Sequence, residues 1–298
     1  MTGRSCSLLA GALLLVLLTA CTSAGLTVHP RVTRSAPAVT GAYVALGDSF
    51  TAAPLTGAQG GPVGCLRSVK DYPSLVAADL GARVSLTNVS CYGATTGDLS
   101  HAQHTAGQSN PAQLSALSAA DRLVTVQIGG DDIGFGQIAS TCGALSLTSP
   151  GGNPCQRHYT AGGTDQLARA VTQAAPQVAA ALAAIRARAP HARVLVVGYP
   201  DILPVRGNGC WPEVTIARGD LPYLRGVETR LNTMLAAAAA RARDTFVDTY
   251  TPSIGHDACQ HHGTKWVEGL IPTSAAVPMH PNALGEQAMA REIEAALR

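Results

Sequence analysis

The sequence predicts an α/β protein of three layers, an α/β/α sandwich in which helices cover both faces of a parallel sheet. Short β-type runs alternate with helical stretches along the chain, which is typical of such sheets. Most of these runs are continuously apolar, as strands buried on both faces should be. The first four end in glycine or polar residues, which parallel strands would gather in one crevice.

Five strands and five helices are expected in strict alternation. The predicted strands are Ala42–Leu46, Arg83–Val89, Leu123–Ile128, Arg193–Val197 and Thr245–Val247. The predicted helices are Tyr72–Leu80, Pro111–Ser118, Asp165–Arg188, Leu221–Arg243 and Ala283–Leu297. The Gly- and Pro-rich stretch 141–163 is too long for a simple connection, so we expect it to be a surface insertion.

Length and composition limit the possible classes of protein. The 298 residues allow one large domain or two small ones, and we assign 41–298 to a single domain. A composition of 46% hydrophobic and 13% charged residues supports a sizeable core and argues against disorder. The formal net charge of +2 provides no basic field, which argues against nucleic acid as a partner.

The first 40 residues predict export. Arg4 and the apolar run Leu8–Leu18 indicate a signal peptide over 1–20, and eleven apolar residues are too few for a bilayer span of roughly 20. The segment Leu18–Cys21 resembles a bacterial lipobox, in which Cys21 is lipid-modified and anchors the protein to the outer face of the cell membrane. The alternative is ordinary cleavage nearby, which gives a free secreted protein. Residues 21–40 then form a lipidated start and a flexible tether rich in Thr, Ser, Ala and Pro.

Six cysteines remain once Cys6 and Cys21 are set apart. An even number of cysteines in an exported protein predicts disulfides, and six permit 15 connectivities. We predict pairing between neighbours, because each pair would close a loop beside a predicted strand end. The predicted pairs are Cys65–Cys91, Cys142–Cys155 and Cys210–Cys259.

A serine lies in the turn that follows the first predicted strand. Ser49 comes directly after Gly47 and Asp48, at a strand end where open α/β sheets place their chemistry. A serine hydroxyl is a weak nucleophile unless a base takes its proton, and His280, just before the last helix, is the candidate base. Each residue alone would be interpreted as a turn serine or a surface histidine. Together they predict a serine hydrolase.

Four segments, in order, resemble the sequence blocks of the GDSL, or SGNH, hydrolase family: 47–50, 90–96, 128–135 and 279–285. Phe50 stands where the family name has leucine, which is a common variant. Segments 255–259 and 265–267 are also similar to the secreted actinobacterial branch. The resemblance covers about 41–298 and implies a flavodoxin-like fold with a parallel five-stranded sheet. It also implies hydrolysis of esters, thioesters or acyl groups on sugars, without a cofactor.

The resemblance implies roles for individual residues. Ser49 would attack the acyl carbon and His280 would take its proton, while the N–H groups of Ser49 and Gly93 and the side chain of residue 131 would hold the oxyanion. Fatty-acyl esters and lipids are the substrates expected from the family. We expect the protein to be a monomer. The alternatives are a weakly active or inactive surface-binding lipoprotein and a carbohydrate O-deacetylase.

Two positions depart from the family's pattern. The family often has an aspartate three residues before the histidine, where this chain has Val277. Asp248 and Asp257 could reach the histidine only if the fold brought them close. The resemblance to the secreted branch, whose members use a main-chain carbonyl instead, implies that the Val277 carbonyl orients His280 in a Ser–His dyad. Asp131 stands where the family has an asparagine that donates to the oxyanion, and an ionised carboxylate has no donor. Loss of one such donor costs roughly 2.7–4 kcal/mol. Burial and the neighbouring Asp132 are expected to raise the pKa of Asp131 and restore an O–H donor; the alternative is a slow enzyme.

A second cluster near the end of the chain has residue types that bind zinc: His256, Asp257, Cys259, His261 and His262. A cysteine of an exported protein is expected to be oxidised, and no second motif with ligand spacing accompanies the cluster. We therefore predict no metal site.

Overall fold

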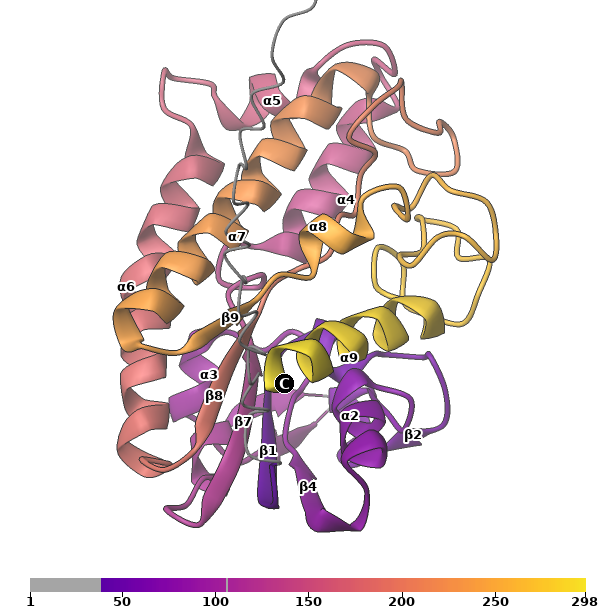
Figure 1. The fold of residues 1–298 in the computed structure, drawn as a ribbon. Coiled ribbons are helices and arrows are strands. Elements are labelled where there is room, and N and C mark those ends of the chain that lie inside the picture. The colour runs from indigo at the N-terminus through magenta and orange to yellow at the C-terminus, as the bar shows by residue number, and fades with distance from the viewer. Residues whose placement is uncertain (1–38, 106) are drawn as a thin grey trace, which may run out of the picture. The chain divides into compact units, whose positions relative to one another are not determined.

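Five parallel strands form the central sheet of the computed structural model, which describes residues 39–105 and 107–298 (Figure 1). They are β1 (Gly41–Gly47), β4 (Val84–Asn88), β7 (Asp121–Gln127), β8 (Arg193–Val197) and β9 (Thr245–Val247). Their spatial order is β4-β1-β7-β8-β9, which is the flavodoxin-like order. The predicted α/β class with a five-stranded parallel sheet is confirmed.

Successive side chains of the strands point to opposite faces of the sheet and belong to two hydrophobic cores, one on each face. Val44 and Leu46 of β1 belong to the core under α6 (Gln166–Arg188) and α7 (Leu221–Ala242), whereas Tyr43 belongs to the opposite core. That second core lies under α2 (Tyr72–Leu80) and α9 (Ala283–Leu297). Figure 1 shows these two helix pairs on either side of the sheet, so the three-layer arrangement is present.

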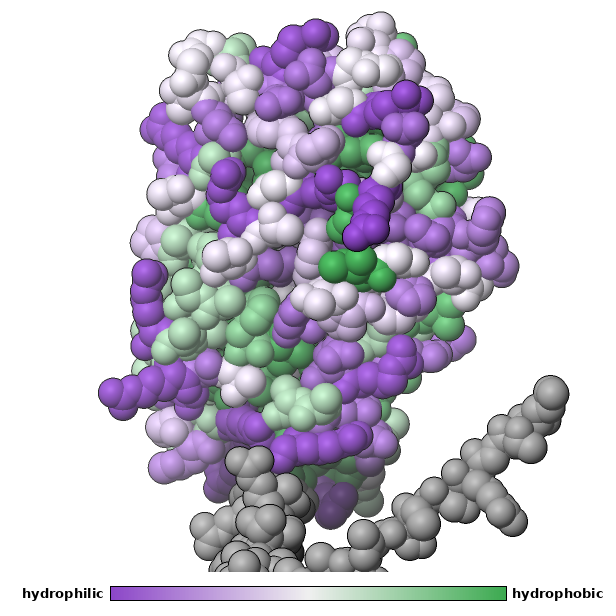
Figure 2. Space-filling view, turned by 45° about the horizontal axis from the view of Figure 1, so that its top comes forward, coloured by the Kyte–Doolittle hydropathy of each residue, from purple (hydrophilic) through white to green (hydrophobic). Residues whose placement is uncertain are grey.

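Capping residues and stripes of apolar residues explain where the long helices begin and end and which side of each is buried. Asp165 caps α6 by accepting from the N–H of Ala168 at 2.9 Å, and Arg186 and Arg188 lie in its last turn, where cations are favoured. The buried positions of α6 recur at helical spacing and the positions between them face solvent. On the face seen in Figure 2, purple hydrophilic residues are intermixed with white and green ones.

Shorter elements connect these layers. The helices are α1 (Ser49–Ala52), α3 (Thr96–Ser100), α4 (Phe135–Ser146), α5 (Pro154–Tyr159) and α8 (Tyr250–Ser253). Two small antiparallel pairs join β2 (Gln59–Gly60) to β3 (Arg67–Ser68) and β5 (Gln103–Thr105) to β6 (Gln108–Asn110). Single 3₁₀ turns cover Val63–Cys65, Gly81–Arg83, Gln113–Ala116 and Arg218–Asp220.

One sequence prediction about these connections was wrong. The segment Pro111–Ser118 forms only the 3₁₀ turn Gln113–Ala116 instead of a helix. Stretch 141–163 has more regular structure than expected, since it completes α4 and includes α5, and the Cys142–Cys155 disulfide joins these two helices beneath exposed residues. Helix α4 escapes detection because glycine costs about 1 kcal/mol within a helix, and Gly134 and Gly136 lie at its start.

The described cysteines form three disulfides, Cys65–Cys91, Cys142–Cys155 and Cys210–Cys259, the same pairs that the neighbour rule predicts. Within residues 39–105 and 107–298, no helix combines the length and apolar character needed to span a bilayer. The predicted signal peptide, Cys21 and most of the tether lie outside the described residues.

Candidate active site

Ser49 is held at the end of β1 by the main chain of the sheet. The Asp48 N–H donates to the carbonyl of Gln127 at 3.0 Å, and the Cys91 N–H donates to the carbonyl of Gly47 at 3.0 Å. Gly47 has a φ of +150°, and a Cβ there would lie 2.5 Å from the Gln127 oxygen, so the close approach requires glycine. The turn therefore lies between the neighbouring strands β4 and β7, where the strand order reverses.

The structure brings Ser49 and His280 together across 231 positions of sequence. Nε2 of His280 lies 2.8 Å from Oγ of Ser49, within hydrogen-bond reach. Nδ1 of His280 lies 2.8 Å from the carbonyl oxygen of Pro278. A carbonyl only accepts, so Nδ1 carries the proton and the lone pair of Nε2 faces the serine.

The expectation that Val277 orients the histidine was wrong by one residue. The Val277 carbonyl accepts from the main-chain N–H of His280 at 3.2 Å, which closes a turn over Pro278 and Met279. Met279 adopts a φ of +62° in this turn. The Val277 oxygen is thereby occupied, and the Pro278 carbonyl contacts the imidazole ring instead.

Aromatic rings surround the imidazole. The ring centroid of His280 lies 4.8 Å from Phe50, 5.8 Å from Phe135 and 5.9 Å from Tyr92, which stacks on it. Burial among these rings lowers the pKa of His280 to about 4, and the Pro278 carbonyl offsets only part of that effect. The imidazole is therefore neutral at neutral pH and able to accept a proton.

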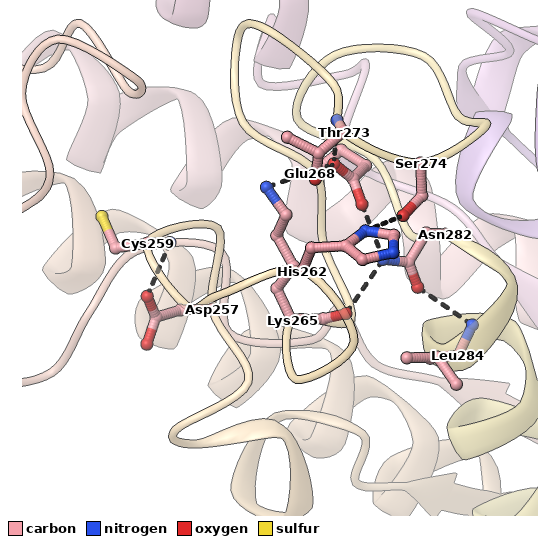
Figure 3. A network of polar contacts seen from close by, with 9 residues as sticks. All are labelled: Asp257, Cys259, His262, Lys265, Glu268, Thr273, Ser274, Asn282 and Leu284. Carbon is pink, nitrogen blue, oxygen red and sulfur yellow. Dashed lines mark hydrogen bonds and ion pairs between the residues drawn. The ribbon is translucent and has the colours of Figure 1, made fainter.

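A buried polar network holds the segment that carries His280 (Figure 3). The Lys265 ammonium lies 3.3 Å from Oε2 of Glu268, and both side chains are buried. Glu268 also accepts hydrogen bonds from Nδ2 of Asn282 at 2.7 Å and from the N–H of Thr273 at 2.7 Å. Burial raises the pKa of Glu268, but these hydrogen bonds and the Lys265 charge outweigh it, so the pKa is lowered.

The same network joins the histidine to the last helix. Oδ1 of Asn282 accepts from the N–H groups of Leu284 at 2.9 Å and Gly285 at 3.2 Å, which caps α9. The N–H of Glu268 donates to the carbonyl of His280 at 2.9 Å. Main-chain and side-chain contacts thus fix the position of His280 from both directions.

Two main-chain N–H groups near the nucleophile are free to bind an anion. Ser49 begins α1 and Gly93 lies in the loop after β4, and among the described residues neither N–H has an acceptor. Gly93 has a φ of +73° and directly follows Tyr92, whose ring stacks on His280. These N–H groups are the donors that the sequence assigns to an oxyanion hole.

Asp131 lies in the loop after β7. Its half-buried side chain lines the same cavity as Ser49, and it has no hydrogen-bond partner among the described residues. Burial, the carboxylate of Asp132 and that of Asp98 raise the pKa of Asp131 to about 6. Asp132 points elsewhere, since Thr96 donates to it from both its N–H and its hydroxyl.

A chain of buried hydrogen bonds links the nucleophile turn to the loops after β7 and β8. The N–H of Gly130 donates to the Tyr199 hydroxyl at 2.8 Å, and that hydroxyl donates to Oδ2 of Asp48. Oδ1 of Asp48 accepts from the N–H of Phe50 at 2.9 Å. Asp48 thus supports the turn directly and, through the Tyr199 hydroxyl, the Gly129–Gly130 peptide.

An apolar cavity of about 80 Å³ opens beside Ser49. Its walls come from α4, α7 and the loop after β8, with Ile138, Leu231 and Ile202 as examples from each. Ser49 and Asp131 are among its few polar lining residues. The dimensions and chemistry suit an apolar chain attached to a group that reacts at Ser49.

The residues of the histidine-rich cluster make packing, disulfide and hydrogen-bond contacts. His256 stacks on Trp266 with ring centroids 3.9 Å apart, Cys259 is in a disulfide, and Nδ1 of His262 lies 3.3 Å from the Ser274 hydroxyl (Figure 3). Across the described part of the chain, no group of three or more His, Cys, Asp or Glu side chains is arranged to hold a metal.

Sequence reasoning missed three residues of this region. Lys265 and Glu268 stand three apart, which would be interpreted as an exposed helical pair, yet they are buried in an irregular loop. Tyr199 donates a hydrogen bond to Asp48, and its place after a predicted strand end was the one sequence signal for such a contact.

A flavodoxin-like sheet with a paired serine and histidine at its switch point defines a class, the serine hydrolases of α/β fold. Residues 45–288 match the GDSL-like Lipase/Acylhydrolase family, and the chain belongs to that family. It is therefore a lipase or esterase. It is 41% identical over 256 residues to Lipase 2 of Streptomyces coelicolor, an alignment that covers 83% of each chain. It is 31% identical over 249 residues to a lipase of Streptomyces rimosus, covering 82% of each.

Solved structures agree with this assignment. Phospholipase A1 of Streptomyces albidoflavus superposes with a TM-score of 0.71 at 26% identity, covering 86% of this chain and 99% of that one. The extracellular lipase of Streptomyces rimosus superposes with a TM-score of 0.69 at 27% identity, covering 86% of this chain and all of that one. The three disulfides are consistent with export.

Proposed function

We propose that this chain is an exported serine esterase or lipase that hydrolyses fatty-acyl esters through a Ser49–His280 dyad and an acyl-enzyme. The observation that carries the proposal is the 2.8 Å contact between Oγ of Ser49 and Nε2 of a histidine whose other nitrogen faces a carbonyl. This geometry activates a serine without a third carboxylate.

The reaction follows from these contacts. His280 takes the proton of Ser49 as its Oγ attacks the acyl carbon, and the oxyanion is held by the N–H groups of Ser49 and Gly93. The C–O bond to the alcohol then breaks, and His280 returns the proton to the leaving alcohol. Water, deprotonated by the same imidazole, attacks the acyl-enzyme and releases the carboxylic acid. No step needs a cofactor.

Asp131 completes the oxyanion hole in its protonated form. Its raised pKa of about 6 leaves a large fraction of the side chain protonated below that pH, and a carboxylic acid donates through its O–H. When ionised, the carboxylate lacks that donor and repels the oxyanion. The proposal therefore includes a rate that falls as the pH rises through about 6.

The apolar cavity supports a fatty-acyl substrate, and relatives described as a lipase and a phospholipase A1 support lipid esters. The same proposal includes an export signal over 1–20, lipidation of Cys21 and a tether over 21–40. It places the protein, as a monomer, on the outer face of the cell membrane. If Cys21 is lipidated, the mass of Cys21→Ala should differ from that of the wild type by the lipid as well as by the substitution. A difference that equals the substitution alone would contradict the lipid anchor.

The test is hydrolysis of short- and medium-chain nitrophenyl esters by the full chain, together with fluorophosphonate labelling. Ser49→Ala should abolish both activities, while Ser140→Ala, which removes an exposed serine of α4, should leave both unchanged. A wild-type chain that neither hydrolyses these esters nor reacts with the probe would contradict the proposal and favour a binding lipoprotein. Hydrolysis restricted to acetylated sugars would favour the O-deacetylase.

A further inference from the structure

One wall of the cavity beside Ser49 carries an acid among apolar side chains. Leu224, Val227, Glu228 and Leu231 are spaced so that one stripe of α7 faces the cavity, and all four line it. Glutamate in such a stripe is unusual, because burying a carboxyl without a partner is costly.

One of the two carboxyl oxygens of Glu228 lacks a partner, although the side chain as a whole is only half-buried. Among the described residues, its buried Oε1 atom has no hydrogen-bond partner, and neither carboxyl oxygen of the nearby Asp201 has one. Burial, followed by the charge of Asp201, raises the pKa of Glu228 well above its ordinary value. The N–H of Ile202 and the charge of Arg225 oppose this shift without reversing it.

The cation near this acid is engaged elsewhere. Nη1 of Arg225 donates to the carbonyl oxygen of Pro204, and no ion pair joins Arg225 to an acid among the described residues. Asp201 has its own pKa raised to about 7 by burial and by Asp257, so it offers Glu228 no positive charge. The raised pKa of Glu228 favours its neutral form, which has an O–H to donate, and the side chain lies at the cavity wall.

We propose that Glu228 is a specificity-determining residue, which donates a hydrogen bond to an oxygen atom on the acyl chain of the substrate. The preferred acyl groups then carry an oxo, hydroxy or ester oxygen partway along the chain, and a plain alkyl chain leaves the acid unpaired. The inference rests on the proposed function, because it takes Ser49 as the point where the acyl carbonyl is attacked. The cavity touches both Ser49 and Glu228, so one chain can reach both.

A site built to hydrogen-bond a substrate oxygen discriminates against the analogue that lacks it, because its polar group is then left unsatisfied. An apolar cavity alone would do the reverse, since it prefers the methylene to the carbonyl. The two interpretations therefore predict opposite orders of preference for matched substrates.

The experiment compares nitrophenyl octanoate with the 4-, 5-, 6- and 7-oxo-octanoates, using the full chain. We expect the wild type to favour at least one oxo isomer by roughly five- to tenfold in kcat/KM, the size of one net hydrogen bond. Glu228→Leu should abolish that preference and accelerate octanoate hydrolysis. Glu228→Gln, which keeps an N–H donor, should retain part of it.

Controls separate the inference from folding and from the proposed function. The ratio of two substrates measured on one variant is independent of the fraction that folds. Glu213→Leu, which removes an exposed acid outside the cavity, should keep the wild-type ratio. Octanoate hydrolysis that disappears in Ser49→Ala upholds the proposed function whatever the ratios show.

Two results would overturn the inference. One is a wild type that favours octanoate over every oxo isomer, or a Glu228→Leu variant whose ratios equal those of the wild type. The other is a Glu228-dependent preference that appears only when the oxygen is placed in the leaving alcohol, which would assign the cavity to the alcohol.

Discussion

The turn that carries Ser49 and the segment that carries His280 are built in different ways. The serine turn is short, follows β1 directly and is fixed by main-chain bonds to the ends of the neighbouring strands. The histidine segment, residues 265–282, has little regular structure and is fixed largely by buried side chains, including the Lys265–Glu268 ion pair. The position of Ser49 is thus set by the sheet, whereas the position of His280 depends on a local polar network.

The two regions should therefore respond differently to substitution. A change in the serine turn acts on the reacting atoms or on hydrogen bonds to the sheet. A change in the histidine segment should act first on stability and, through the position of the imidazole, on rate. Four substitutions test this difference.

The largest effect is expected from the dyad itself. His280→Ala should lower kcat by at least about 10⁴-fold, as in other hydrolases whose nucleophile loses its base. The melting temperature should change far less than the rate. Steady-state hydrolysis of a nitrophenyl ester measures the effect, and a loss below tenfold would mean that another group is the base.

Glu268→Gln probes the support of the histidine. It leaves the Lys265 charge buried without a counter-charge, which typically costs 3–5 kcal/mol of unfolding free energy. The lowered pKa of Glu268 means that the carboxylate stabilises the fold above its ordinary pKa of 4.5 and that this is lost as the pH falls through the lower value in the folded state. The variant should therefore lose the corresponding acid-dependent part of its unfolding curve.

Asp244→Asn is the matched control, since Asp244 pairs with Arg186 far along the sequence from both dyad residues. Both variants should unfold at lower denaturant concentration, but only Glu268→Gln should lower kcat when both are measured well below their midpoints. Equal effects on kcat would show that the histidine segment is held no differently from the rest of the fold.

Asp131→Asn tests the serine side. The amide supplies a permanent donor, so the rate at pH 8 should rise by roughly 10²-fold. Because the pKa of Asp131 is raised to about 6, kcat/KM of the wild type should fall as the pH rises through that value, while the variant stays level. On the acid side, both should lose activity near pH 4, where His280 becomes protonated. An unchanged or lower rate at pH 8 would count against Asp131 as an oxyanion residue.

Tyr199→Phe should have the smallest effect. It leaves the Gly130 N–H without its partner, at a cost of about 1–3 kcal/mol in unfolding free energy. Tyr223→Phe, whose hydroxyl donates to Asp165 at a half-buried site, should cost less. Denaturant unfolding of the two variants decides the order, and a larger loss for Tyr223→Phe would contradict the role given to Tyr199.

The sequence predicted the sheet well because most of the strands are short apolar runs with a clear end. It also identified Ser49 and His280, which lie in local motifs. It did not place the ring contact of His280, because the positive φ of Met279 decides whether Val277 or Pro278 faces the imidazole. Glu228 was missed for a related reason. A glutamate within a helix is normally expected to face solvent, and the cavity that Glu228 lines is formed by elements distant in sequence.

The separation of the dyad also determines when activity first arises. Ser49 belongs to the first strand of the sheet, whereas His280 immediately precedes the helix that packs last in chain order. A growing chain that has not yet reached residue 280 holds a serine without its base, however well the sheet has formed. A partly made chain therefore lacks the proposed Ser49–His280 pair until nearly all of residues 39–298 have been synthesised.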